Sequence, residues 1–428
     1  MATEFNLQNL SLTELHKFTL YNGIIKYGIA AKDEKGWYII MPSHQQSEEN
    51  KYRIIPAQIE NIQTKAESLF ASQPDSGPTI YGSPQFKTLI ILGAGASHNY
   101  SFSKDIINPP LAKDLFDDQY KSLKAQHPGV ESLSPQLFQA KDIEQYFQIQ
   151  WDKIIATHNP VLLNKIVDVQ FYLHALFEKV SSNIDIGRNN YVSFFQTLND
   201  YLIQLGDNQK ALIVSFNYDT ILEQSLARAL YSPFNSLDDY IDVNNRRMLV
   251  FKPHGSWNWV KFFKPEFIDS LNLEKNRSYI MNKLAFERKI TLATIQRNLE
   301  DEPLILPSAY SKYYFPHLLI PYKKKDEFVM PKTHSILLEQ LIRQVNKIIV
   351  IGWKGTEEKF KNLLKRTLSN KKVSVIYATL KDKSIENELK EVLPSASFSE
   401  FDPSGDSKNT FTELNEYLQE FPNSVFYP

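Results

Sequence analysis

The sequence predicts an α/β protein with a Rossmann-like, doubly wound parallel sheet, a helical insertion and a small N-terminal α+β unit. The first observation is a set of short apolar runs, as expected for strands that are buried on both faces of a parallel sheet. The second is that amphipathic helical segments separate most of these runs, and strand–helix alternation is typical of doubly wound folds. The runs occupy residues 89–92, 211–216, 248–251, 303–306, 347–351 and 373–377.

The third observation is a long interval without a clear strand, residues 111–206. Apolar residues between 194 and 205 follow the 3.6-residue period of a helix, and Gly206 is a plausible helix stop. Similar helical faces precede and follow the apolar run at 347–351. The interval 111–206 is therefore predicted to be a helical insertion between the first two strands of the sheet.

The N-terminal residues 1–73 lack the alternation of apolar runs and helices found in the rest of the chain, and they are predicted to form a separate accessory unit. Its SLTE segment, starting at Ser11, has the spacing of a capping box and predicts a short helix. Two strand-like runs follow at 23–31 and 37–41, separated by a turn. Residues 74–85 are rich in turn formers and are expected to be a linker. Residues 86–428 would then form the main domain.

Composition excludes several kinds of chemistry. The chain has 428 residues and no cysteine, so it has no disulfide, no thiolate nucleophile and no cysteine-ligated zinc. The formal net charge of −1 gives no general electrostatic footprint for nucleic acid. Neither a signal peptide nor an apolar run of about 20 residues is recognisable. We expect a cytoplasmic protein that does not bind membranes or nucleic acid directly.

A glycine-containing turn follows the first predicted strand of the sheet. It consists of Gly93, Ala94, Gly95, Ala96 and Ser97, in a chain that has only 14 glycines. Glycine lets a backbone come close to a ligand, and the amides that follow it can point at phosphate. A plain strand-to-helix turn would need one glycine rather than two. The motif favours a nucleotide or phosphate site, with an ordinary turn as the alternative.

Polar residues follow the second predicted strand, where Asn217 and Asp219 occur in the segment SFNYD. Ligands of open α/β sheets bind at the carboxyl ends of strands, so this position favours a binding role. Asparagine and aspartate are also good turn and cap residues. The sequence leaves open whether Asp219 binds a ligand or only caps the next helix.

Two further strand ends carry candidate residues. His254 follows the run 248–251 within the segment HGSWNW, where it has either a functional or a purely structural role. Gly352 ends the apolar run 347–351 and is followed by Trp353. This glycine marks either a plain strand–loop–helix junction or a second close approach of the backbone to a nucleotide.

Taken in order, these motifs resemble one family. GAGAS, SFNYD, HGS and a late apolar strand ending in glycine, together with the phrase PPLAKDLF, are similar to the bacterial sirtuin-like branch of the silent information regulator family. In antiphage defence proteins this branch forms an NAD-hydrolysing domain. The resemblance covers residues 86–428 and does not include the N-terminal unit.

The resemblance implies a role for each motif residue. Gly93, Ala94, Gly95, Ala96 and Ser97 would cradle the NAD phosphates. At the strand ends, Asn217 would orient the ribose or a water, and His254 would be the general base. Asp219 would hold the nicotinamide side of the pocket, and Gly352 would approach the adenosine ribose.

The chain departs from deacetylating sirtuins in three places. Residues 257–302 contain none of the cysteines of a zinc module, so a small zinc-free subdomain is expected there. The stretch after the first glycine loop reads SFSKDIINPP instead of a GIPDFR-like segment. Trp353 and Lys354 stand after Gly352, where deacetylases place a small hydroxyl residue.

The resulting hypothesis is an NAD+ glycohydrolase that depletes NAD+ in antiphage, abortive-infection defence. Because nicotinamide leaves from a ring that is already cationic, a polar amide and one base can suffice. An NAD-dependent protein deacylase and a non-catalytic nucleotide-binding sensor or assembly subunit remain alternatives. The resemblance also implies gating by homo-oligomerisation or by a partner, such as a ring ATPase, an Argonaute or a phage-derived activator.

Overall fold

A computed structural model describes most of the chain between residues 84 and 400, together with three N-terminal strands. The described ranges are 11–19, 25–33, 36–40, 84–98, 109–140, 142–157, 159–184, 190–265, 299–307, 314–321, 328–378 and 384–400.

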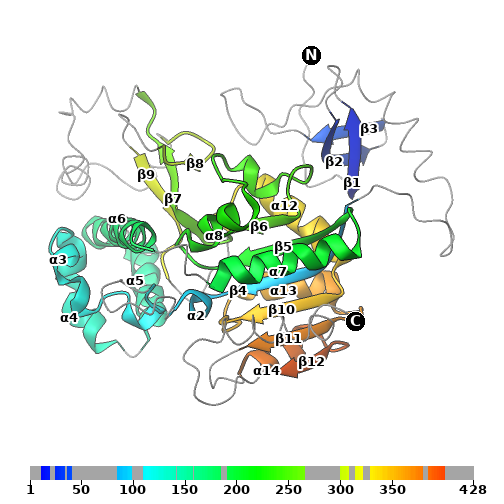
Figure 1. Ribbon diagram of the computed structural model, residues 1–428. Helices are drawn as coiled ribbons and strands as arrows, with labels where there is room; N and C mark the ends of the chain where they lie inside the picture. Colours follow the sequence, from blue (N-terminus) through cyan, green and yellow to red (C-terminus); the bar gives the residue numbers. More distant parts are fainter. Residues whose placement is uncertain are drawn as a thin grey trace.

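A six-stranded parallel sheet forms the centre of the molecule (Figure 1). Its spatial order is β12-β11-β10-β4-β5-β6, so the chain runs outward in one direction from β4 and in the other from β10. This reversal confirms the predicted doubly wound, Rossmann-like sheet. The strands are β4 (Gln85–Leu92), β5 (Gln209–Ser215), β6 (Met248–Phe251), β10 (Lys347–Ile351), β11 (Ser374–Ala378) and β12 (Ser397–Glu400).

Burial explains why the central strands were recognisable as apolar runs. Every residue of β5, β6 and β10 is buried, because helices cover both faces of the sheet. Helices α7 and α8 pack against each other, as do α13 and α14, while α12 contacts β6. These helices are α7 (Asn190–Leu205), α8 (Ile221–Leu230), α12 (Lys332–Leu341), α13 (Glu358–Leu368) and α14 (Ser384–Val392), with 3₁₀ turns at Asp238–Ile241 and Ile342–Gln344.

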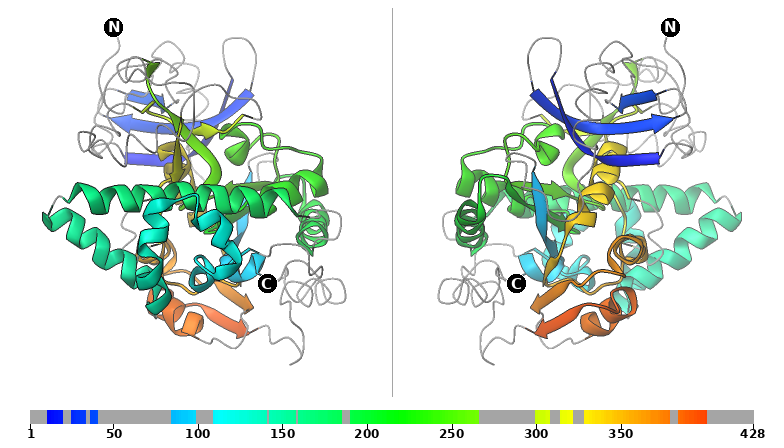
Figure 2. Two further views of the ribbon diagram at one scale, coloured as in Figure 1. Left: turned by 90° about the vertical axis from the view of Figure 1, so that its left-hand side faces the viewer. Right: turned by 90° about the vertical axis from the view of Figure 1, so that its right-hand side faces the viewer.

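Four helices from the interval 111–206 stand beyond the carboxyl edge of the sheet and face the viewer in the left view of Figure 2. They have a core of their own, which includes Phe147, Tyr172 and Leu176. By contrast, α7 packs into the core of the main sheet. The four are α3 (Lys121–Lys124), α4 (Pro128–Gln139), α5 (Ile143–Thr157) and α6 (Pro160–Ser182), preceded by 3₁₀ turns at Ala112–Asp114 and Asp118–Tyr120.

A second, antiparallel sheet begins at the HGS motif. It consists of β7 (Gly255–Phe262), β8 (Leu304–Ile305) and β9 (Tyr314–Leu318), in the order β8-β7-β9. The expectation that 303–306 belongs to the parallel sheet is wrong, because β8 pairs with Trp259 and Val260 of β7. Its two residues are only half-buried, unlike those of the central strands. Residues 266–298 of the expected zinc-free subdomain lie outside the described residues.

The N-terminal strands form a three-stranded antiparallel sheet of β1 (Ser11–Thr19), β2 (Ile25–Asp33) and β3 (Gly36–Ile40). The two strands expected here are confirmed, but the helix expected from Ser11 is wrong. Pairing with β2 provides hydrogen-bond partners for the backbone of β1, and this outweighs a local capping signal. Most of the expected linker at 74–85 lies outside the described residues, and Gln85 already belongs to β4.

Candidate functional site

The register of the parallel sheet brings the candidate motifs to one edge. Leu92, the last residue of β4, lies opposite Ser215 of β5 and Ile351 of β10. Val214 of β5 lies opposite Phe251, the last residue of β6. The glycine turn, SFNYD, HGS and Gly352 therefore all begin at the carboxyl edge, and β4 and β10 flank the topological switch point where ligands of such sheets bind.

The two glycine loops at this switch point touch through their backbones. The amides of Gly93 and Gly95 donate hydrogen bonds to the carbonyl oxygens of Ile351 and Gly352, at 3.0 and 3.1 Å. A Cβ on Gly352 would lie 2.3 Å from the amide nitrogen of Ala96, and one on Gly93 would lie 2.4 Å from the carbonyl oxygen of Gly352. Glycine is thus required here for loop-to-loop contact. Contact of these loops with NAD phosphates stays a prediction.

Asn217 connects the end of β5 to helix α2 (Ala94–Ser97). Its Nδ2 donates to Oγ of Ser97 at 2.9 Å, and that hydroxyl lies 3.0 Å from the hydroxyl of Tyr191 on α7. The other polar atom of the amide, Oδ1, is buried and has no hydrogen-bond partner among the described residues. An unpaired buried oxygen is costly, which makes this atom a good acceptor for a bound ligand.

Asp219 lies two residues further along the same loop and is almost fully buried. Burial raises the pKa of its carboxyl group to about 6, and Glu223 adds to that rise. Lys252, the backbone N–H of Ile221 and the Ser97 hydroxyl lower the pKa and so oppose the rise. Oδ1 accepts from the N–H of Ile221, the first residue of α8, at 3.1 Å, although the N-cap position itself belongs to Thr220. Its contact with a ligand stays a prediction.

His254 follows β6 and sits in an aromatic wall of the site. Its ring lies 5.0 Å from that of Phe216 and stacks at 6.1 Å on Tyr218, with distances measured between ring centroids. Trp353 extends this wall, because its ring stacks on that of Phe216 with the ring centroids 5.4 Å apart. Nε2 of His254 lies 3.9 Å from Oε1 of Glu357. The histidine is therefore held among rings beside a carboxylate.

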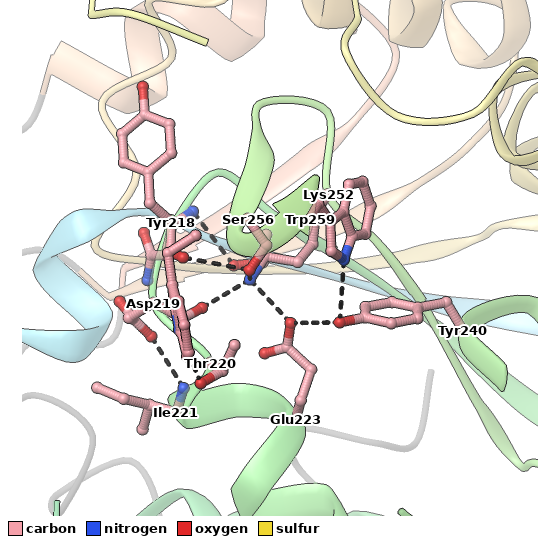
Figure 3. Close-up of polar contacts among 12 residues, drawn as sticks. Tyr218, Asp219, Thr220, Ile221, Glu223, Tyr240, Lys252, Ser256 and Trp259 are labelled. Atoms are coloured by element: carbon pink, nitrogen blue, oxygen red, sulfur yellow. Dashed lines mark hydrogen bonds and ion pairs between the residues drawn. The ribbon is translucent and has the colours of Figure 1, made fainter. Parts of the chain in front are cut away.

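A buried ion pair lies behind these loops and ties them together (Figure 3). The Nζ of Lys252 donates to Oε1 of Glu223 at 2.8 Å, to the carbonyl oxygen of Asp219 at 2.6 Å and to Oγ of Ser256 at 2.8 Å. Tyr240 donates to the same Glu223 oxygen at 2.9 Å. Lys252 lies two positions before His254, and Asp219 lies two positions after Asn217. The bonds of the Lys252 ammonium therefore link the segments that follow β5 and β6.

These residues surround one cavity of about 800 Å³. Both glycine loops line it, as do Asn217, Asp219 and His254. Ala96 and Ser97 are not on its wall, although Ser97 supports Asn217 from behind. The opposite wall comes from the helices beyond the sheet edge and includes Leu115, Asp142, Ile143, Glu144 and Phe177.

The wall contains residues that sequence reasoning did not assign to the site. Glu357 and Trp353 line the cavity, and Lys252 supports it from below. No local pattern marks Glu357 or Trp353 as site residues. They reach His254 only because β10, which precedes them, and β6, which precedes His254, end at the same edge of one parallel sheet.

Within the described ranges, no three His, Asp or Glu side chains gather as ligands for a metal ion. The helices of those ranges also include none that is long and apolar enough to cross a membrane.

Comparison with known protein families covers most of these strand ends. Residues 211–399 are similar to the model of the SIR2-like domain. The match contains Asn217, Asp219, His254 and Gly352, and it begins after the 93–97 loop, which the sheet adds to the site. It is shorter than the resemblance expected for residues 86–428.

Two solved structures of sirtuins are similar to this chain. One, from work on sirtuin substrate affinity, is 12% identical with a TM-score of 0.33. The other, from work on the mechanism and regulation of Sir2 enzymes, is 9% identical with a TM-score of 0.30. Each similarity covers 79% of this chain and 94% of the other. No curated protein matches the sequence.

Proposed function

We propose that the chain is an NAD+ glycohydrolase, which cleaves NAD+ into nicotinamide and ADP-ribose. The SIR2-like domain supports an NAD-related activity. The observation that carries the proposal is that Asn217, whose amide oxygen has no partner among the described residues, and His254 line one cavity. An amide acceptor and an imidazole are the groups that this reaction needs beside the ribose.

The cavity offers a path for a dinucleotide. Its volume of about 800 Å³ is within the usual range for small-molecule sites. One end lies at Ala378, Ser384 and Ile385, beyond β10, and we assign the adenosine to it. The glycine loops are in the middle, where Lys354 on the wall can neutralise phosphate charge. Nicotinamide and its ribose would then lie beside Asn217 and His254.

The proposed reaction breaks the bond between C1′ of the ribose and the ring nitrogen of nicotinamide. The bonding electrons pass to the cationic pyridinium ring, which becomes neutral on leaving. A water oxygen bonds to C1′, and its proton passes through His254 to solvent. In this proposal Oδ1 of Asn217 accepts a hydrogen bond from the water or the ribose. We assign the Asp219 carboxylate, which also lines the cavity, to the nicotinamide side, where its negative charge would stabilise a cationic C1′ centre.

Two other functions use the same cavity. An NAD-dependent protein deacylase would cleave NAD+ only in the presence of an acylated peptide. A nucleotide-binding sensor or assembly subunit would bind NAD+ without cleaving it. The absence of cysteine, and so of a four-cysteine zinc module, favours hydrolysis over deacylation.

We further propose that hydrolysis serves antiphage, abortive-infection defence in the cytoplasm. Because an unregulated NADase would deplete its own cell, its activity is gated by homo-oligomerisation or by a partner. The classes of partner that fit the resemblance are a ring ATPase, an Argonaute and a phage-derived activator. The N-terminal unit 1–73 is the candidate for receiving that signal, because it lies outside the SIR2-like domain.

Mass spectrometry of NAD+ incubated with the purified full chain tests the proposal. We expect equal amounts of nicotinamide and ADP-ribose, and a loss of at least about a hundredfold in Asn217→Ala and in His254→Ala. Asn183→Ala, at the exposed end of α6, is the matched control and should retain activity. The experiment is repeated with lysate from phage-infected cells and with acylated peptide. NAD+ that stays intact under all conditions, or is consumed only with peptide, contradicts hydrolysis.

A further inference from the structure

Lys252 is a charged residue whose side chain is fully buried behind the cavity and does not line it. Taking an ammonium group out of water costs free energy unless hydrogen bonds and a counter-charge replace the water. All three of its N–H bonds are used, and their acceptors are Oε1 of Glu223, the carbonyl oxygen of Asp219 and Oγ of Ser256 (Figure 3). Glu223 supplies the counter-charge, whereas the other two bonds reach the segments that carry the candidate catalytic residues.

The first of these segments is the loop after β5, residues 216–220, which we call the site loop. Lys252 binds the carbonyl oxygen of Asp219 at 2.6 Å. The preceding carbonyl, that of Tyr218, accepts from Oγ of Ser256 at 3.2 Å and from the backbone N–H of Trp257 at 2.9 Å. Because an ammonium group only donates, the Ser256 hydroxyl accepts from Lys252 and keeps its own proton for Tyr218. Two successive peptide groups of the site loop are therefore held from behind.

The second segment is the turn of residues 252–256, which we call the histidine turn because His254 is its middle residue. Lys252 and Ser256 are its ends, and the 2.8 Å bond from Nζ to Oγ joins them across the histidine. The backbone N–H of Gly255 donates to the carbonyl oxygen of Lys252 at 3.0 Å and closes the same turn. One ammonium group therefore closes the histidine turn and also holds the site loop.

The ammonium group is itself held in a fixed place. Oε1 of Glu223, on α8, accepts from Lys252 and also from the hydroxyl of Tyr240 at 2.9 Å. The indole N–H of Trp259, on β7, donates to that hydroxyl at 3.4 Å. Tyr240 and Trp259 are fully buried in the core of the main sheet. The anchor of the two segments is thus connected to the core by hydrogen bonds.

We propose that Lys252 is a positioning residue, whose ammonium group sets the separation and direction of the site loop, with Asn217 and Asp219, relative to the histidine turn, with His254. The role in catalysis rests on the proposed NAD+ cleavage, whereas the link between the two segments does not. Neutral side chains can often replace a buried ion pair with little loss of stability. They cannot replace three directed hydrogen bonds, so stability and catalysis should respond differently when the pair is removed.

Steady-state kinetics of NAD+ cleavage by the full chain test the positioning role. We expect Ser256→Ala to lower kcat at least about tenfold with little change in KM, because contacts with the dinucleotide remain while the reacting groups are displaced. Lys252→Met combined with Glu223→Gln should lose as much kcat, although it leaves no uncompensated charge. Lys210→Met is the matched control and should keep its kcat: Lys210 is also buried and donates to the Arg246 carbonyl at 2.6 Å, but it lies near the start of β5.

Amide hydrogen exchange of the full chain, measured by mass spectrometry without NAD+, tests the link itself. In Ser256→Ala we expect exchange of residues 216–222 to rise about tenfold or more, because the loop opens locally more often. Strand β10 is the internal reference and should exchange as in wild type. An equal rise in β10 would indicate global destabilisation instead of a loosened site loop, and it would overturn the inference.

The remaining outcomes are also decisive. Wild-type kcat in Ser256→Ala, or a change confined to KM, overturns the inference, as does an equal loss of kcat in Lys210→Met. If the double variant does not fold, Ser256→Ala alone decides. Wild-type protein that cleaves no NAD+ would overturn the proposed function, and the exchange measurement would then decide whether Lys252 and Ser256 link the two segments.

Discussion

The amide of Asn217 donates a 2.9 Å hydrogen bond to the hydroxyl of Ser97, across 120 residues of sequence. This bond joins the end of β5 to the helix after β4, and β4 and β5 are neighbours in the sheet. It also orients the amide so that Oδ1, the atom without a partner among the described residues, is the one available to a ligand. The short helix α2, for which the sequence predicts phosphate binding, therefore also supports the candidate catalytic residue Asn217.

A double-mutant cycle on this pair should show coupling. Because both groups are buried, we expect Ser97→Ala and Asn217→Ala together to destabilise less than the sum of the single changes, by about 1 kcal/mol. The measurement is the free energy of unfolding in urea. Ser97→Ala combined with Asn183→Ala is the control pair and should be additive. Equal additivity in both pairs would mean that the hydrogen bond contributes nothing to stability.

Substitution of Gly352 should disturb the contact between the glycine loops. In Gly352→Ala the new methyl group meets the amide of Ala96 at 2.3 Å, and φ of +59° adds strain. We expect a loss of several kcal/mol in unfolding free energy. Gly206→Ala has strain from φ of +129° but its nearest contact is 3.4 Å away, so it should cost only about 1 kcal/mol. Similar losses in the two variants would show that the loop contact is unimportant.

Removal of the Lys252 ammonium should leave the Glu223 carboxylate buried without its counter-charge. We expect Lys252→Met to lower the free energy of unfolding by about 3–5 kcal/mol. Adding Glu223→Gln should recover part of this loss, because the amide is neutral and its oxygen still accepts from Tyr240. Urea denaturation of the three variants measures the recovery. A double variant no more stable than Lys252→Met would argue against an uncompensated charge as the cause.

Asp219 should make stability depend on pH between about 4 and 6. Its folded pKa of about 6 exceeds the ordinary value of 3.8, so the folded state binds more protons in this window. Stability from this group is therefore lost as pH rises from 4 to 6, by roughly 3 kcal/mol at most. Asp219→Asn should remove this contribution from the pH dependence of unfolding. Asp207→Asn, whose carboxyl group is fully exposed, is the control and should leave the dependence unchanged.

Pairing partners explain where sequence reasoning failed on the fold. The SLTE segment has a good local helix signal, yet Leu15 and Phe18 lie in a strand because they pair with β2. Likewise, the run 303–306 is apolar, but its strand joins β7 in a separate antiparallel sheet. Neither partner is recognisable from the segment itself, because strand pairing is a long-range interaction.

The sequence by itself determined the central sheet and the order of its motifs. Strands buried on both faces must be apolar along their whole length, and they end at turns that show in the sequence. Tertiary structure alone decided the surroundings of His254. Glu357 lies 103 positions after His254 in the sequence. Its Oε1 comes within 3.9 Å of His254 Nε2 only because parallel strands end at a common edge. Burial and electrostatic pairing depend on distances between residues that are far apart in the sequence, and no local sequence pattern reveals these distances.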